Sequence, residues 1–270
     1  MNLEGGKAVI AVPHINVDIT AKEFLRNVEV MVEGAKERGA HLVILPSPLH
    51  PLIDVLKGTK RISSYESSNE ELINRLLYLS NKFLLYILIS PIIRRAGSKR
   101  YLTSVLLTPQ GGEIYVKKIF SDSSLQGIIS PGRDIDLLEI DGEIGTKVCV
   151  LIGSDILIPE ISRLCNFLGS DIMISIQLPL ITSIKPDIIK SIAITRAVEN
   201  SIPFINLGSY TRDRSNLIPT LVVSSAGDVI DLCEDFESSL LIVEVGRRNI
   251  ASGESFIIRN LKNLIRKIVI

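Results

Sequence analysis

The sequence predicts an α/β protein in which a mixed sheet, or a pair of sheets, is covered by helices. Three observations predict this class. Short apolar runs rich in β-branched residues alternate with segments of helical periodicity, several neighbouring runs are joined by turn residues as in hairpins, and 46% of the residues are hydrophobic. We expect a single domain over residues 1–270, because no linker or low-complexity tract divides the chain.

The expected elements follow from local patterns. Thr20 and Glu23 form a capping box that opens a helix closed by Gly39, and Ser68 and Glu71 predict a second box opening a helix to about Lys82. Further helices are expected from residue 159 and over residues 185–201. Strands are expected over residues 7–12, 41–45, 84–89, 101–107, 113–116, 146–152, 171–175, 204–207, 221–224, 229–232 and 240–245.

Composition excludes several classes of function. Thirty basic and thirty acidic residues leave no net charge, so there is no electrostatic case for nucleic-acid binding. No apolar run reaches the ~18 residues that a membrane-spanning helix needs. Three cysteines without a signal peptide argue against a disulfide framework and favour a cytoplasmic protein.

Residues 143–160 form the stretch around which we expect the site to be built. A buried strand over residues 146–152 ends in Gly153, Ser154 and Asp155, and a helix pattern begins at Pro159. In open α/β folds, the chemistry is placed where a strand ends in a small-residue turn that leads into a helix.

This stretch resembles the nucleophile elbow of the nitrilase, or carbon–nitrogen hydrolase, superfamily. Asp155, Pro159 and Glu160 match the end of its G-x-x-I-C-x-D-x-x-F-P-E pattern. Residues 40–46 (AHLVILP), 112–117 (GEIYVK), 130–132 (SPG), 196–200 (RAVEN) and 226–230 (AGDVI) resemble its other motifs in the same order. The resemblance covers nearly the whole chain and implies an α-β-β-α sandwich of two sheets flanked by helices.

The resemblance also implies a catalytic triad of Glu, Lys and Cys and no metal or cofactor. In that triad Glu removes the thiol proton, the thiolate attacks an amide or nitrile carbon, and Lys stabilises the developing negative charge. Here Ser47 occupies the Glu position, Gly153 occupies the Cys position, and Lys117 alone matches the triad. We therefore expect an inactive member, a pseudoenzyme that binds a small anionic or amide-like ligand, or a partner protein.

Ser47, Lys117, Gly153, Ser154 and Asp155 are the expected ligand-binding residues. Lys117 is expected to pair with Asp155, Asp122 or a ligand anion, since an unpaired buried ammonium is costly. Arg196, Glu199 and Asn200, which share a helix face, are expected to be structural.

An amide hydrolase with a relocated nucleophile is the alternative function. Ser154, next to the elbow, is the best substitute, with His50 as the nearest candidate base in the sequence. The three cysteines of the chain, Cys149, Cys165 and Cys233, are expected to be packed structural side chains.

The C-terminal residues 255–270 predict an amphipathic helix with apolar Ile257, Leu261, Leu264 and Ile268 on one stripe. Basic amphipathic helices can lie on membranes, but we favour docking at the domain or at a subunit interface. The resemblance implies a homodimer or higher homo-oligomer.

Overall fold

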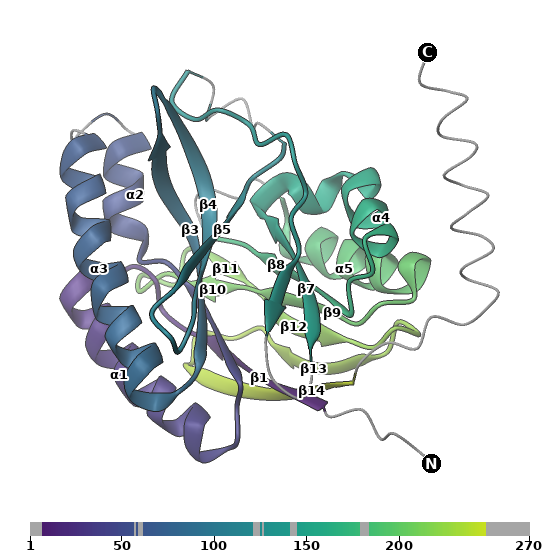
Figure 1. Ribbon diagram of the computed structural model, residues 1–270. Coiled ribbons are helices and arrows are strands. Elements are labelled where there is room, and N and C mark those ends of the chain that lie inside the picture. The colour runs from purple at the N-terminus through teal and green to yellow at the C-terminus, as the bar shows by residue number, and fades with distance from the viewer. Residues whose placement is uncertain are drawn as a thin grey trace.

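A computed structural model describes residues 7–56, 58, 62–120, 125, 127–140, 145–178 and 184–246, without the side chains of residues 50, 51 and 56. Two six-stranded sheets pack face to face between two layers of helices, which confirms the expected α-β-β-α sandwich (Figure 1). No helix in this described part is long and apolar enough to cross a membrane.

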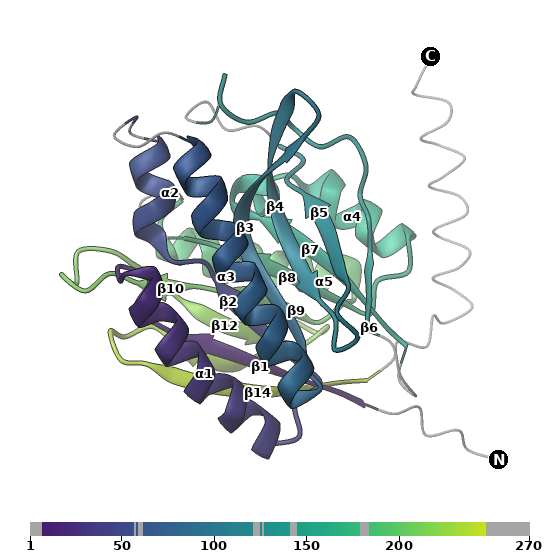
Figure 2. The ribbon, with the colours of Figure 1, turned by 60° about the vertical axis from the view of Figure 1, so that its left-hand side comes forward.

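The first sheet has the strand order β14-β1-β2-β3-β4-β5. Its strands are β1 (Lys7–His14), β2 (Leu42–Pro46), β3 (Tyr86–Ala96), β4 (Lys99–Leu107), β5 (Glu113–Lys117) and β14 (Ser239–Gly246). Helices α1 (Ala21–Glu37), α2 (Leu49–Leu56) and α3 (Ile62–Phe83) cover its outer face (Figure 2). Residues 49–56 had no predicted element, because eight residues after two prolines give too short a periodic pattern.

The second sheet has the order β13-β12-β9-β8-β7-β6. Its strands are β6 (Leu138–Ile140), β7 (Thr146–Ile152), β8 (Ile172–Ile176), β9 (Phe204–Leu207), β12 (Thr220–Val223) and β13 (Val229–Cys233). Helices α4 (Pro159–Phe167) and α5 (Pro186–Asn200) cover its outer face, and the short strands β10 (Ser209–Tyr210) and β11 (Leu217–Ile218) pair beside it.

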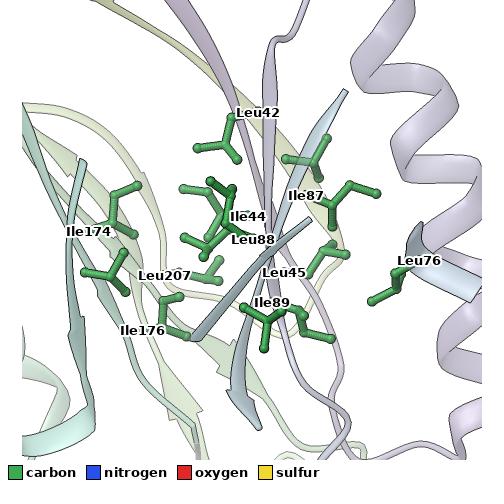
Figure 3. Packing of buried hydrophobic residues seen from close by; sticks show 14 of the residues in the cluster. Leu42, Ile44, Leu45, Leu76, Ile87, Leu88, Ile89, Ile174, Ile176 and Leu207 are labelled. Carbon is green, nitrogen blue, oxygen red and sulfur yellow. The ribbon is translucent and has the colours of Figure 1, made fainter. Parts of the chain in front are cut away.

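The main hydrophobic core fills the space between the sheets and continues beneath α3. Ile44 and Leu88 point toward Ile174 and Leu207 of the opposite sheet, whereas residues one step along the same strands point toward α3 (Figure 3). This is the period-two alternation of strands that are buried on both faces. The unbroken apolar runs that predict these strands therefore reflect burial from two sides.

The N-terminus of α3 differs from the prediction. Ser67 and Ser68 lie inside this helix, where their hydroxyls donate to the carbonyls of Ser63 and Ser64, and the helix begins at Ile62. The Ser68 capping box is thus wrong, because a serine can bond back to the preceding turn as readily as it can cap. The Thr20 cap is confirmed, since Thr20 Oγ1 accepts a hydrogen bond from the Glu23 amide.

A buried histidine links the two sheets. His14, at the end of β1, lies 2.8 Å from Thr220 Oγ1 through Nδ1 and 2.9 Å from the Asp235 carbonyl oxygen through Nε2. Because a carbonyl only accepts, Nε2 carries the proton, so Nδ1 accepts from the Thr220 hydroxyl. Burial lowers the pKa of His14 from its ordinary value of 6.5. The neutral ring is therefore the form that holds the sheets together.

Acid is expected to weaken the fold through this residue. The unfolded chain takes up a proton near pH 6.5, whereas the folded chain resists protonation until a lower pH. The contribution of His14 is thus complete above pH 6.5 and is lost as the pH falls toward the folded pKa. Urea midpoints measured between pH 8 and pH 5 should fall less steeply for His14→Gln than for the wild type, and parallel profiles would contradict this role.

Candidate functional site

The candidate site lies where β7 ends. Ile152 is followed by the 3-10 helix η2 (Gly153–Leu157), and α4 then starts at Pro159, as the sequence predicts. Gly153 has a φ of +56°, a left-handed conformation that glycine adopts at little cost. A β-carbon at this position would lie 3.9 Å from Lys118 Nζ and would meet no other atom within 4 Å outside its chain neighbours. Position 153 therefore faces a lysine across open space.

Lys118 is the lysine of this site. Its side chain is 3% exposed, and Nζ donates to Ile152 O at 2.7 Å, to Ser154 Oγ at 2.8 Å and to Asp155 Oδ1 at 3.2 Å. Three acceptors match the three N–H donors of an ammonium group. Lys118 Nζ is thus fixed by these three acceptors at the start of η2.

Asp155 balances the charge of Lys118. Its carboxylate also accepts from the backbone amides of Phe120 at 2.7 Å, Ile119 at 3.2 Å and Ile152 at 3.3 Å. Burial raises the pKa of the Asp155 carboxyl from its ordinary value, while Lys118 and these amides act in the opposite direction. The pair is a fully buried ion pair with no net charge, and it ties η2 to the chain that follows β5.

Lys117, the lysine that the sequence motif selects, lies elsewhere. Its side chain is exposed, and its ammonium lies 4.8 Å from the centre of the Tyr101 ring. The expected contact with Asp155 is made by Lys118 instead, so the site prediction was displaced by one residue. Strand alternation could have revealed this, because Lys118 lies two residues after the buried Val116 and Lys117 points to the opposite side.

Ser47 follows β2, at the carboxyl end of a central parallel strand of the first sheet. Its amide donates to the Ser90 carbonyl at 2.8 Å, and its hydroxyl is buried without a hydrogen-bond partner. Next to it, Ser104 Oγ donates to Ser90 Oγ at 2.7 Å. Ser47, Ser90 and Ser104 thus form a row of small hydroxyl side chains at this end of the sheet.

Gln177 is a site residue that the sequence did not reveal. It follows β8, and its Nε2 donates to Gly153 O at 2.8 Å and to Ser175 Oγ at 2.7 Å. This contact fixes the peptide unit at which η2 begins. Its position just beyond the carboxyl end of a buried parallel strand is the signal that could have identified it.

The alternative nucleophile Ser154 is half-buried, and its Oγ accepts from Lys118. The side chain of His50, its proposed partner, lies outside the described residues. The other histidines are engaged away from η2, since His14 bonds to Thr220 and His41 Nδ1 accepts from the Val9 amide. Among the described side chains, Lys118 is therefore the basic group that contacts Ser154.

Cys149 and Cys165 form a disulfide between β7 and α4, with their Cα atoms 5.8 Å apart. Both are fully buried, as expected of packed structural cysteines, but their pairing corrects the sequence argument against a disulfide framework. An odd cysteine count does not exclude one bond, and Cys233 is left as the free thiol. The closed loop contains all of η2, so the disulfide fixes both ends of the segment that carries the site.

Arg196 supports the same segment from α5. Its Nε donates to Ile156 O at 3.1 Å, its Nη2 donates to Leu157 O at 3.3 Å, and its Nη1 forms an ion pair with Glu199 at 2.9 Å. Asn200 Nδ2 in turn donates to the Arg196 carbonyl at 2.9 Å. These contacts are those of the structural group that the sequence predicts.

Comparisons with known proteins agree with this architecture. The carbon–nitrogen hydrolase family model matches residues 8–253. A cysteine-to-alanine variant of the Nesterenkonia AN1 amidase from the nitrilase superfamily has a TM-score of 0.76 at 17% identity, covering 98% of this chain and 98% of that chain. Another variant of the amidase from Nesterenkonia sp. AN1, which shows covalent addition of the acetamide moiety of fluoroacetamide at its active-site cysteine, has a TM-score of 0.77 at 16% identity and covers 100% and 99%. A comparison with curated protein sequences finds no match.

Proposed function

Because the chain belongs to the carbon–nitrogen hydrolase family, we propose that it is a member that binds a small ligand or a partner without hydrolysing amides or nitriles by a Glu–Lys–Cys mechanism. One observation carries this proposal. Gly153 stands at the end of β7 in a left-handed conformation facing Lys118, so the setting for a nucleophile is present without a side chain to attack. Ser47, the residue at the expected base position, has no carboxylate.

The charge of the site favours an uncharged ligand over an anion. Lys118 already donates to three acceptors, one of them the carboxylate of Asp155, so no net positive charge remains to attract a carboxylate or phosphate. Of the two ligand classes that the sequence suggests, we therefore propose the amide-like one.

Ligand binding is tested by thermal melting of the full chain with a panel of small amides and the matching carboxylates. Amides that bind only the folded state should raise the melting temperature with concentration, and the carboxylates should not. Gly153→Ala, which places a methyl group beside Lys118, should abolish the amide response, while Gly34→Ala serves as a control on an open helix surface. Stabilisation by carboxylates alone would contradict an uncharged ligand.

A hydrolase that uses Ser154 is the second candidate, favoured by the 2.8 Å contact between Ser154 Oγ and Lys118 Nζ. It requires Lys118 to act as the base for the Ser154 hydroxyl, although Nζ already donates to Ile152 O and to Asp155. Ammonia release from amides, N-carbamoyl compounds and nitriles tests it. Turnover that is abolished by Ser154→Ala but retained in Lys117→Ala would establish this candidate and contradict the non-catalytic proposal.

The family resemblance supports a further proposal, a homodimer or higher homo-oligomer. The neutral overall charge supports a protein that does not bind nucleic acid. Sedimentation velocity on the full chain would test the oligomeric state directly.

A further inference from the structure

Exposed apolar side chains lie along α5 and the neighbouring edge strand β13. Val198 of α5 is 49% exposed, and Ile230 and Leu232 of β13 are 63% and 38% exposed. We call these three residues the α5–β13 strip. Strand β13 is the last strand in its sheet, paired with β12 on one side and with no described strand on the other. An exposed edge carrying large apolar side chains is a surface that proteins usually cover.

Two contacts show that α5 runs beside β13. At one end, Lys190 of α5 forms an ion pair with Glu234 at 2.7 Å. At the other end, the turn before β13 lies against α5, since a β-carbon at Gly227 would lie 2.6 Å from Val198 Cγ2. Leu232 pairs with Leu221, which packs in the core beneath α5, so Leu232 and Ile230 point to the α5 side.

The border of the strip is strongly acidic. Residues 228–237, which include β13, carry five carboxylates and no basic residue: Asp228, Asp231, Glu234, Asp235 and Glu237. All five are exposed. A covering segment would therefore need an apolar stripe flanked by positive charge.

The chain itself contains such a segment. Strand β14 ends at Gly246, and residues 247–270 carry six basic residues and a single acidic one, Glu254. The helical periodicity over residues 256–270 gives an apolar stripe, with Lys262 and Lys267 outside it. Ten residues separate Gly246 from this stripe, and an extended chain of ten residues reaches up to roughly 33 Å, about the width of a small domain.

We propose that residues 256–270 dock as an amphipathic helix on the α5–β13 strip of the same chain. The apolar stripe covers Ile230, Leu232 and Val198, and the basic side chains lie against Asp228 and Glu234 at the two ends of the strip. This is the helix-in-groove mode of recognition, with charge fixing the orientation. The inference is independent of the proposed function, since the strip shares no residue with the Lys118 site.

Zero-length carbodiimide cross-linking of the full chain tests the docking, because it joins a lysine only to a carboxylate in direct contact. Links from Lys262 or Lys267 to Asp228 or Glu234 are expected in protein of monomer mass. The variant Ile230→Asp/Leu232→Asp should lose these links and should release residues 247–270 to trypsin at least tenfold faster. Val30→Asp, on the exposed face of α1, is the matched control and should change neither readout.

Three results would overturn the proposal. Links found only in covalent dimers would assign the segment to a second copy of the chain. Links to other carboxylates would place it on another surface, and the absence of links from both lysines would show that it does not dock. Because these cross-links are measured on the wild-type chain, they test the docking even if the double variant does not fold.

Discussion

Replacing Lys118 with methionine is expected to lower the free energy of unfolding by roughly 3–5 kcal/mol, the usual cost of breaking a buried ion pair by removing one partner. Asp155 would then remain buried with its three backbone donors but without a cation. Urea unfolding followed by far-UV circular dichroism is the suitable measurement, because the chain has no tryptophan. Lys117→Met, which changes an exposed side chain, should stay within about 0.5 kcal/mol of the wild type.

The pH dependence of the Lys118→Met variant provides a second check. Without the ammonium, the pKa of Asp155 should rise further above its ordinary value. The folded variant then takes up a proton more readily than the unfolded chain. The loss of unfolding free energy relative to the wild type should therefore shrink as the pH falls through the folded pKa of Asp155. Adding Asp155→Asn should recover part of the lost stability at neutral pH. A loss of unfolding free energy that is the same at every pH would contradict an origin in the unpaired charge of Asp155.

Removing the disulfide is the second change with a large expected effect. Cys149 and Cys165 are sixteen residues apart, and a bond that closes a loop of about 15 residues contributes about 3 kcal/mol. For a chain of this size, the double variant Cys149→Ala/Cys165→Ala should melt roughly 6–12 °C lower. A reducing agent should lower the melting temperature of the wild type and leave that of the variant unchanged.

Thiol titration of the unfolded, unreduced protein provides the control for that prediction. One reactive thiol, from Cys233, is expected, and Cys233→Ser should leave none. Three thiols in the wild type would show that the pair is reduced. Because the disulfide is present, the cysteine count no longer supports a cytoplasmic location.

The sequence predicts the fold well where burial and turn chemistry act together. The unbroken apolar run of β7, the small residues of η2 and the proline that opens α4 specify a strand, a turn and a helix without long-range information. Helix α3 shows the limit of this reasoning. It already includes Ile62, before a serine that local pattern alone cannot distinguish from a cap.

The candidate site is predicted less completely, because its key contacts join distant segments. The motif locates the lysine to within one residue, and strand alternation from the buried Val116 decides that Lys118 and not Lys117 reaches η2. The Cys149–Cys165 pair and the contact between Gln177 and the Gly153 carbonyl arise from packing of α4 and β8 against β7. The spacing of residues in the sequence does not predict such contacts.

Covalent labelling with fluoroacetamide, followed by peptide mapping, tests most directly whether the site lacks only its nucleophile and base. The variant Ser47→Glu/Gly153→Cys should acquire an acetamide group at position 153, much faster than at Cys233, because position 47 then carries a base for the thiol proton and Lys118 Nζ lies beside position 153. Adding Lys118→Met should remove this acceleration, and adding Lys117→Met should not. The wild type should remain unlabelled at η2. Labelling of Ser154 in the wild type, or a thiol at position 153 no more reactive than Cys233, would contradict the account.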